Sequence, residues 1–471
     1  MKLRKLIITL VMMGIVFAEC ISAKAVNVVQ IPASEIDTVY YQSIDSNQFT
    51  GWPEGPRIYS EAGIVMNADT GTILYAKNID NPHYPASITK VLTALVALEH
   101  NELTKTVTIT PDDYNFLKSG DNHIGLKNKE EITMEDALHG TLLASGNEVA
   151  HAVGSNTEGG YDNFIRLMNE KAAELGCTNS NFTNSHGLHD DEHYTSARDM
   201  ALIASAAFKN EEFMRITGTL TYTIPETNIT NEKRSFQQHH KMMFDWRDQY
   251  YEYCVGGKTG YTGKALNTLV TFASKDGVNL VSVVLRTHGT GNAYVDTRAM
   301  MEYAFNNFSK VTVTTDMAAV YGVKSIDEGS YVMTPAGVPF EDLEYSVEMP
   351  TELDDRTGSI TYTYEGQVVG KIGTTVTEEY YNELHGIEEE KTEEAAPKKV
   401  EQKKPAKYKK VLVVIGKVLL GIVFVAVLGF VLLVCYVAYR RKQIRKRKQA
   451  RRKREEEYQK YLERTQDPDI D

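Results

Sequence analysis

The hydrophobic positions between residues 58 and 307 follow two periods, which predict strands at both ends and helices between them. Two β-rich runs, 64–67 and 72–75, flank Asp69-Thr70-Gly71, a pattern typical of a hairpin. Helical spacing predicts helices at 87–99, 134–143, 148–153, 162–175, 196–209 and 296–306. Strand patterns return near 221–224, 257–262, 268–273 and 280–285. We therefore expect an α/β (α+β) fold, an antiparallel sheet flanked by helices with a helical subdomain.

The pattern changes after residue 307. Short alternating runs at 311–314, 318–321, 331–333, 343–348, 358–364 and 367–375 predict a small, separate all-β domain over 308–385. Residues 386–410 are rich in Glu, Lys, Pro and Ala, a composition typical of a flexible stalk.

The first 25 residues are predicted to be a signal peptide. A basic start, an apolar core at 6–18 and the small-x-small sequence Ala23-Lys24-Ala25 have the order of an export signal. A lipoprotein site at Cys20 is a weaker alternative, because Glu19 is the wrong residue type before a lipidated cysteine. Residues 26–57 form an N-terminal lead segment.

A long apolar run near the other end predicts a single transmembrane helix at 411–439. The segment 418–439 holds 22 uncharged residues, enough to cross a bilayer core as a helix. The segment 440–454 follows with 11 Lys and Arg and no acid, so the tail 440–471 is expected in the cytoplasm. The protein is therefore expected in the cell membrane with residues 58–307 on the outer side.

Composition adds two limits. The chain has 471 residues, 42% hydrophobic, and a formal net charge of −12 despite the basic tail, so we expect no nucleic-acid partner. Four cysteines are present; Cys20 and Cys435 lie in the predicted signal and span. Cys177 and Cys254 can form a disulfide, but two free buried thiols are favoured because a domain of this size needs no covalent staple.

Three short motifs occur in one order: Ser87-Ile88-Thr89-Lys90, Ser145-Gly146-Asn147 and Lys258-Thr259-Gly260. Ser87 offers a hydroxyl nucleophile, and Lys90 lies one helical turn away, where an uncharged amine can take the serine proton. Burial and the neighbouring charge of Lys258 would favour that uncharged form. Each motif alone is weak: the first also fits a surface helix, and the second and third would be better explained as a plain turn and an exposed strand end. Together they supply an acyl-transfer site.

The run from His189 to His193 resembles a metal site only superficially. Zinc needs ligands that converge, and five adjacent polar residues on a loop are more often solvated. We therefore expect no metal, and no cofactor elsewhere.

The three motifs resemble those of low-molecular-mass penicillin-binding proteins, the serine-type D-alanyl-D-alanine carboxypeptidases of the β-lactamase/transpeptidase-like superfamily. The resemblance covers residues 58–307, and more loosely the chain to about 384. It also rests on the segments 62–67, 70–75, 84–87, 186–188 and 193–195.

The resemblance implies a role for each site residue. Ser87 is the nucleophile, Lys90 the base and Ser145 a proton relay. Asn147 holds the substrate amide, and the terminal carboxylate is bound by Lys258 and Thr259, with Thr262 as a further contact. The backbone N–H groups of Ser87 and Tyr261, beside Gly260, form the oxyanion hole. His186 shapes a bordering loop, in a structural role or with an influence on deacylation.

Two departures from the family concern the carboxylate site. Ala265-Leu266 stands where relatives tend to have Ala-Gly, and Tyr294 stands where many have an arginine. Arg286 is one candidate to replace that charge.

The expected partners are a peptidoglycan stem peptide ending in D-Ala-D-Ala, β-lactam antibiotics as covalent inhibitors, and the membrane. Two alternatives remain. A β-lactamase would need a deacylating base, typically in a Glu-x-x-Leu-Asn loop, which the sequence lacks. A β-lactam sensor would need a signalling domain, for which the tail 440–471 is too short.

Overall fold

The computed structural model describes residues 32, 35–289, 291–318, 322–348 and 356–385. Its centre is a five-stranded antiparallel sheet with strand order β2-β1-β9-β8-β7. The strands are β1 (Ser60–Asn67), β2 (Ile73–Lys77), β7 (Cys254–Thr262), β8 (Leu266–Lys275) and β9 (Val278–Thr287). The predicted hairpin and the three later strands are therefore confirmed, and β7 is an outer strand of this sheet.

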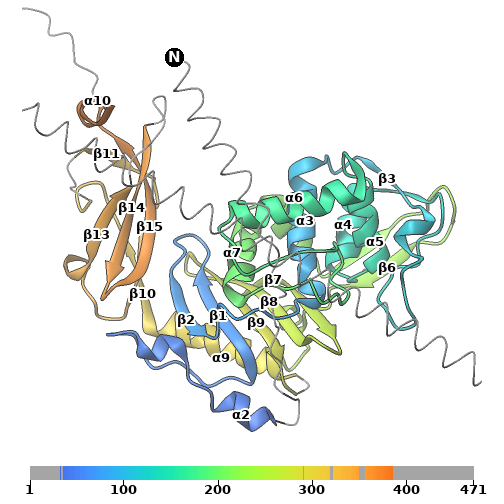
Figure 1. Cartoon of the computed structure of the whole chain (residues 1–471), viewed down its shortest axis with the longest axis horizontal. Helices are drawn as coiled ribbons and strands as arrows, with labels where there is room; N and C mark the ends of the chain where they lie inside the picture. The colour runs from blue at the N-terminus through green and yellow to red at the C-terminus, as the bar shows by residue number, and fades with distance from the viewer. Residues whose placement is uncertain (1–31, 33–34, 290, 319–321, 349–355, 386–471) are drawn as a thin grey trace, which may run out of the picture. The chain divides into compact units, whose positions relative to one another are not determined.

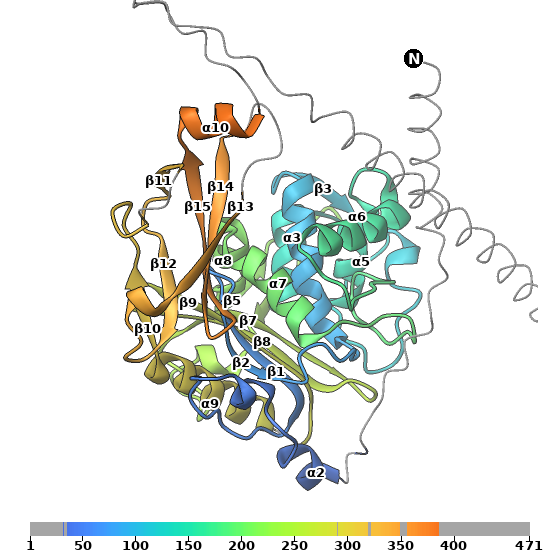
Figure 2. The same ribbon diagram turned by 60° about the vertical axis from the view of Figure 1, so that its left-hand side comes forward.

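Both faces of the sheet are covered by helices (Figures 1 and 2). Helix α9 (Asn292–Asn307) packs on one face, and α7 (Ala197–Phe208) packs on the other. Alternate residues of β1 belong to different cores: Ile64 packs with the helical part, and Val65 packs with Met300 of α9. This double coverage explains why β1 is buried along its whole length.

The helical part lies between β2 and β7 in the sequence. It contains α3 (Lys90–His100), α4 (Met134–Leu142), α5 (Asn147–Ser155), α6 (Gly160–Glu174), α7 and α8 (Glu211–Thr217). All were predicted except α8. The first predicted helix is divided, because a 3-10 turn, η3 (Ala86–Thr89), precedes α3. The short elements β3 (Thr106–Thr108), η4 (Pro111–Asp113), β4 (Glu131–Thr133), β5 (Thr221–Ile224), β6 (Arg234–Gln237) and η5 (Lys241–Met243) complete it, and only β5 was predicted.

The lead segment is packed against the sheet. It contains α2 (Ile36–Tyr40) and η2 (Asp45–Gln48). The buried Lys77 ammonium donates to three carbonyl oxygens, those of Val39 (2.8 Å), Ile58 (3.1 Å) and Ser60 (2.9 Å). These bonds tie the lead segment to the hairpin.

The described part of the chain after α9 contains strands together with two short helical elements. Strands β10 (Phe308–Thr312) and β12 (Tyr331–Pro335) pair, and a four-stranded sheet has the order β11-β15-β14-β13. Its strands are β11 (Val323–Ile326), β13 (Glu344–Glu348), β14 (Thr357–Tyr364) and β15 (Gln367–Val376); η6 (Phe340–Asp342) and α10 (Glu378–His385) are also present. The strand predicted at 318–321 falls mainly on residues that are not described. The Tyr331 hydroxyl contacts Asn67 and Asp69, so these strands contact the hairpin.

No helix among the described residues is both long and apolar enough to span a bilayer. The predicted signal peptide, stalk, transmembrane helix and tail all lie outside the described residues.

Candidate active site

The candidate nucleophile lies in the turn η3, directly before α3. Ala86, the residue before Ser87, has a positive φ of 52°, and the turn is held by two bonds. Thr89 Oγ1 donates to the Ala86 carbonyl (2.8 Å), and Thr268 Oγ1 of β8 donates to the Pro85 carbonyl (2.8 Å). The first bond closes the turn on itself and the second attaches it to the sheet, so the position of Ser87 is fixed.

Lys90 begins α3 and is fully buried. Its Nζ lies 3.1 Å from Ser87 Oγ and 2.8 Å from Asn147 Oδ1, and it also contacts the His186 carbonyl oxygen. A neutral amine has two N–H donors and one lone pair. Two of these partners are pure acceptors and the third is a hydroxyl, so the site suits a neutral Lys90 that accepts the Ser87 proton.

Burial favours that neutral form. Loss of solvent, and then the Lys258 charge, hold the pKa of Lys90 well below its usual value, while Glu148 and Asp121 act weakly in the opposite direction. Among the described residues, neither Lys90 nor Lys258 forms an ion pair with a carboxylate.

Ser145 contacts the second lysine of the site, Lys258. Ser145 lies between α4 and α5 with a positive φ of 60°, and Lys258 Nζ donates to its Oγ at 2.9 Å. Lys258 Nζ also donates to the Thr259 carbonyl (2.9 Å). The sequence predicts a fixed positive charge here, but burial lowers the pKa of Lys258 to about 7, so this charge titrates near neutral pH.

The predicted residues converge on one cavity. Ser87, Ser145, Asn147, His186 and the segment 259–262 all line a cavity of about 900 Å³, with Lys90 and Lys258 behind its wall. Residues from all three sequence motifs therefore lie at the same cavity.

Gly260 explains why β7 can approach the nucleophile. A Cβ atom at this position would lie 2.3 Å from Thr268 Oγ1 and 3.0 Å from the Ser87 nitrogen. The absent side chain lets the strand pack against η3, which carries the Ser87 N–H. Beside it, Tyr261 is 65% exposed at the cavity rim, and Thr262 Oγ1 accepts the Ala265 N–H (3.0 Å).

The loop at His186 contacts the catalytic group through its backbone. The His186 carbonyl binds Lys90, whereas the ring stacks on Phe116 (4.7 Å between centroids) and its Nδ1 accepts the Leu188 N–H (3.1 Å). Burial, and then Lys90, hold the pKa of His186 well below its usual value. Gly187 has a φ of 84°, and a Cβ there would lie 2.0 Å from the Ala86 carbonyl oxygen.

Glu148 is a residue that the sequence analysis misses. It is buried directly after Asn147, and its carboxylate accepts the backbone N–H groups of Ile124 (2.5 Å) and Gly125 (3.0 Å). Burial raises its pKa. Because residues 118–122 line the cavity, Glu148 positions that wall. No motif or spacing identifies such a contact with a separate loop.

Arg286 does not take the place of the family's arginine. Its Nε donates to the buried Glu61 carboxylate (2.8 Å), its guanidinium also contacts the Lys264 carbonyl, and it does not line the cavity. Tyr294 lines a neighbouring cavity instead.

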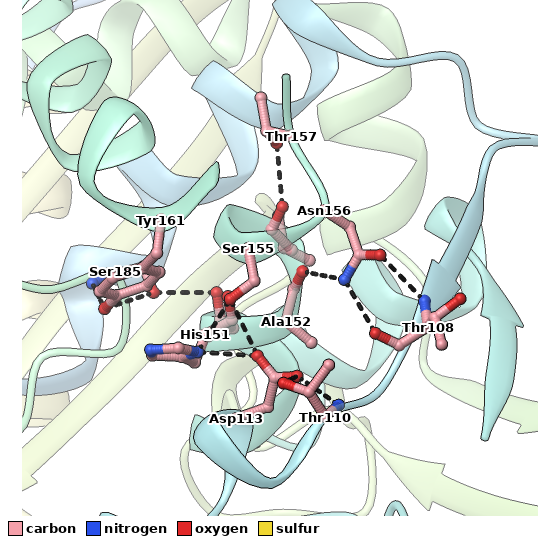
Figure 3. Close-up of polar contacts among 12 residues, drawn as sticks. Thr108, Thr110, Asp113, His151, Ala152, Ser155, Asn156, Thr157, Tyr161 and Ser185 are labelled. Atoms are coloured by element: carbon pink, nitrogen blue, oxygen red, sulfur yellow. Dashed lines mark hydrogen bonds and ion pairs between the residues drawn. The ribbon is translucent and has the colours of Figure 1, made fainter. Parts of the chain in front are cut away.

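A Ser-His-Asp group lies nearby, with Ser155 and His151 on α5 and Asp113 in η4, but its geometry does not suit nucleophile activation (Figure 3). Asp113 Oδ1 and Ser155 Oγ both meet the same ring nitrogen of His151, Nδ1, at 2.7 and 3.1 Å. In a catalytic triad the serine and the carboxylate bind opposite ring nitrogens. The His151 ring stacks on Tyr161 (3.7 Å), so this cluster is structural.

The remaining candidate side chains have other partners. His193 is buried and bonds Thr89 Oγ1 (2.8 Å), which supports η3, while His189 lies 3.3 Å from Asp191. No group of three or more potential metal ligands occurs among the described residues. Cys177 and Cys254 are free thiols, and burial raises the pKa of Cys254 to about 12.

A mixed α/β fold of this kind, with a cavity-lining serine bonded to a buried lysine and a second lysine on the adjoining strand, defines a serine acyl-transfer enzyme of the penicillin-binding type. The family model described as "D-alanyl-D-alanine carboxypeptidase" matches residues 50–289, about half of the chain. The chain therefore belongs to the D-alanyl-D-alanine carboxypeptidase family of serine peptidases.

Individual relatives agree with this assignment. The chain is 26% identical over 332 residues to D-alanyl-D-alanine carboxypeptidase DacF of Bacillus subtilis, covering 66% of this chain and 83% of the relative. A solved D-alanyl-D-alanine carboxypeptidase from Mycobacterium tuberculosis is 30% identical, with a TM-score of 0.50 over 55% of this chain and 95% of that one. The Streptomyces K15 DD-transpeptidase is 28% identical, with a TM-score of 0.50 over 54% and 99% of the two chains.

Proposed function

We propose that this protein removes the C-terminal D-Ala from peptidoglycan stem peptides through an acyl ester on Ser87, and that β-lactams acylate the same oxygen. The observation that carries the proposal is the contact of Lys90 Nζ with Ser87 Oγ (3.1 Å), with two carbonyl-type acceptors for the amine's own protons.

In acylation, neutral Lys90 takes the proton as Ser87 Oγ attacks the penultimate carbonyl carbon. The N–H groups of Ser87 and Tyr261 stabilise the oxyanion. Ser145, bonded to Lys258, relays a proton to the leaving nitrogen as the C–N bond breaks. Water then hydrolyses the ester and restores the Ser87 hydroxyl.

Substrate binding uses the outer strand of the sheet. Within the described residues, one side of β7 has no strand partner in the sheet, so an extended peptide can pair with it while Asn147 binds its amide from the other side. Lys258, Thr259 and Thr262 attract the terminal carboxylate, and Gly260 allows the close approach. His186 holds Lys90 through its carbonyl and shapes the adjoining wall.

The chain outside the catalytic part suggests where it works. The sequence supports a signal peptide at 1–25, a small β domain at 308–385 that acts as a spacer, a stalk at 386–410, a span at 411–439 and a cytoplasmic tail. The catalytic part would then face the cell wall. External protease should release the catalytic part from intact cells stripped of their outer wall layers, and leave the tail in the membrane fraction.

The decisive test of activity is release of free D-Ala from diacetyl-Lys-D-Ala-D-Ala by the purified full chain. Ser87→Ala should abolish both D-Ala release and labelling by fluorescent penicillin. Penicillin labelling with no D-Ala release would favour the sensor alternative, and rapid penicillin hydrolysis would favour the β-lactamase alternative. Release that survives Ser87→Ala would contradict the proposal.

A further inference from the structure

A second cavity adjoins the candidate active site. Its volume is about 640 Å³, and its walls come from β6, the loop 238–247, the strands β7 and β8, and the start of α9. Thr259 and Asn267 line both cavities. Since Thr259 is proposed to bind the terminal carboxylate, the second cavity begins where the leaving residue of the substrate ends.

The charge of this cavity is opposite to that of the protein. The cations Lys241 and Arg247 line it, and no Asp or Glu does, in a chain whose net charge is −12. Lys241 and Arg247 are both exposed, and neither forms an ion pair with a described residue. Exposed cations without acidic partners attract anions.

Aromatic rings form another part of the wall. Trp246 is 63% exposed, its ring lies 4.7 Å from that of buried Phe244, and Lys241 Nζ lies 5.9 Å above the Tyr294 ring. Tyr294 stands at the position where many relatives have an arginine. The positive charge on this side of the site is thus carried by Lys241 and Arg247, further from Thr259 along the cavity wall.

We propose that the second cavity binds a leaving group that is larger than alanine and carries an additional carboxylate, as at the cross-link between two stem peptides. The inference rests on the proposed function. Lys241 and Arg247 bind the additional carboxylate, and Trp246 and Tyr294 contact the aliphatic chain that leads to it.

The chemistry is that of the same acyl transfer. The Ser87 Oγ–C bond forms, the C–N bond to the larger leaving group breaks, and the Ser87 proton passes to that nitrogen. Water then adds to the ester carbon, the C–Oγ bond breaks and Ser87 regains its proton. No further reactant is needed.

Three substrates that share the same acyl group and differ in the leaving group test the inference. Diacetyl-Lys-D-Ala is joined to D-Ala, to D-2-aminopimelate, or to D-2-aminopimelate with its side-chain carboxylate converted to an amide. Release of each amine by the purified full chain gives kcat/KM. We expect the carboxylate form to be preferred to its amide by about tenfold, with a preference that falls as salt rises.

The matched variants are Lys241→Gln, Arg247→Gln and, as a control on an exposed lysine elsewhere, Lys209→Gln. Each cavity variant should reduce the preference by about threefold, and the double variant should bring it close to one. Release of D-Ala should stay unchanged in all of them, and Lys209→Gln should keep the full preference.

Two failures can be told apart. Normal D-Ala release with no preference for the carboxylate, or with a preference that survives the double variant, overturns this inference alone. Absence of release from all three substrates, together with no acylation of Ser87, overturns the proposed function and this inference with it.

Discussion

Two polar clusters include residues of helix α5, and they differ in whether their buried titratable groups have a partner of opposite charge. At its start, Asn147 contacts Lys90, and the two lysines of the active site have no carboxylate ion pair among the described residues. One turn further along, His151 pairs with the buried Asp113 at 2.7 Å. The helix therefore carries a reactive cluster around Lys90 and a structural cluster around Asp113.

The difference shows in the pKa values. At Lys90 burial prevails, and the pKa falls well below its usual value, so the amine is available as a base. At Asp113 burial alone would raise the pKa, but hydrogen bonds from His151, Thr110 and Ser155 outweigh it, and the pKa is lowered. A buried amine without an ionic partner is driven toward its neutral, reactive form, whereas a buried carboxylate that accepts several hydrogen bonds stays charged and stabilises the fold.

The sharpest test of the reactive cluster is Lys90→Gln. Glutamine cannot accept the Ser87 proton, so acylation by fluorescent penicillin should slow by a factor on the order of 1000. The labelling rate is measured by gel at saturating drug. Lys209→Gln, on an exposed lysine, is the control. Acylation of Lys90→Gln within tenfold of the natural rate would remove Lys90 from its role.

A smaller effect is expected when the loop that contacts Lys90 is displaced. Gly187→Ala places a Cβ against the Ala86 carbonyl at 2.0 Å, so the loop must move and acylation should slow by about 100-fold. Gly176→Ala is a matched control, since Gly176 has the same left-handed backbone (φ 85°) and no neighbour within 4 Å of its Cβ. Equal losses in the two variants would mean that backbone strain, and not the clash, is responsible.

A substitution in the structural cluster around Asp113 should lower the stability of the protein and leave the acylation of Ser87 intact. Asp113→Asn should reduce the free energy of unfolding by about 2–3 kcal/mol at pH 7, measured by urea denaturation, while penicillin labelling of the folded protein persists. The exposed Asp112 provides a matched control, Asp112→Asn.

The acid dependence of this loss follows from the lowered pKa of Asp113. The contribution is fully present above the unfolded value of about 3.9 and disappears as pH falls through the lower folded value. The gap between the natural chain and Asp113→Asn should therefore narrow below about pH 4. A gap of constant size down to pH 2 would show that the charge of Asp113 is not what stabilises the cluster.

The smallest expected effect concerns Lys258. With a pKa of about 7 it loses its charge in mildly alkaline solution, so kcat/KM for D-Ala release should fall about fivefold between pH 7 and pH 8. Lys258→Arg keeps a positive charge and should be slower overall but free of this decline. A natural chain without the alkaline decline would show that substrate binding does not depend on a charged Lys258.

The sequence alone predicts those elements and site residues that depend on a pattern within one short segment. Apolar spacing within a single segment predicts α4, α6 and α7, and the turn residues Asp69-Thr70-Gly71 predict the β1–β2 hairpin. The three motifs identified Ser87, Lys90 and Lys258 because each carries its own chemistry in a few consecutive residues.

The sequence was insufficient where a side chain's partner comes from a distant segment. Arg286 could be proposed for the cavity because its charge was visible, but its partner Glu61 lies 225 positions away. The same limit applies to Lys258, whose burial lowers its pKa, and to His186, which contacts Lys90 through a backbone oxygen that every residue has.

The left-handed backbone at Ala86 and Ser145 has a consequence for how this enzyme can change. Such conformations cost on the order of 1 kcal/mol or more in non-glycine residues, and here both occur where acyl transfer is proposed. A glycine at residue 86 would relax the local geometry and make the fold more robust, yet it would loosen the serine that follows. Selection for heat resistance would therefore favour glycine at such a position, whereas selection for turnover would favour the strained residue that is present.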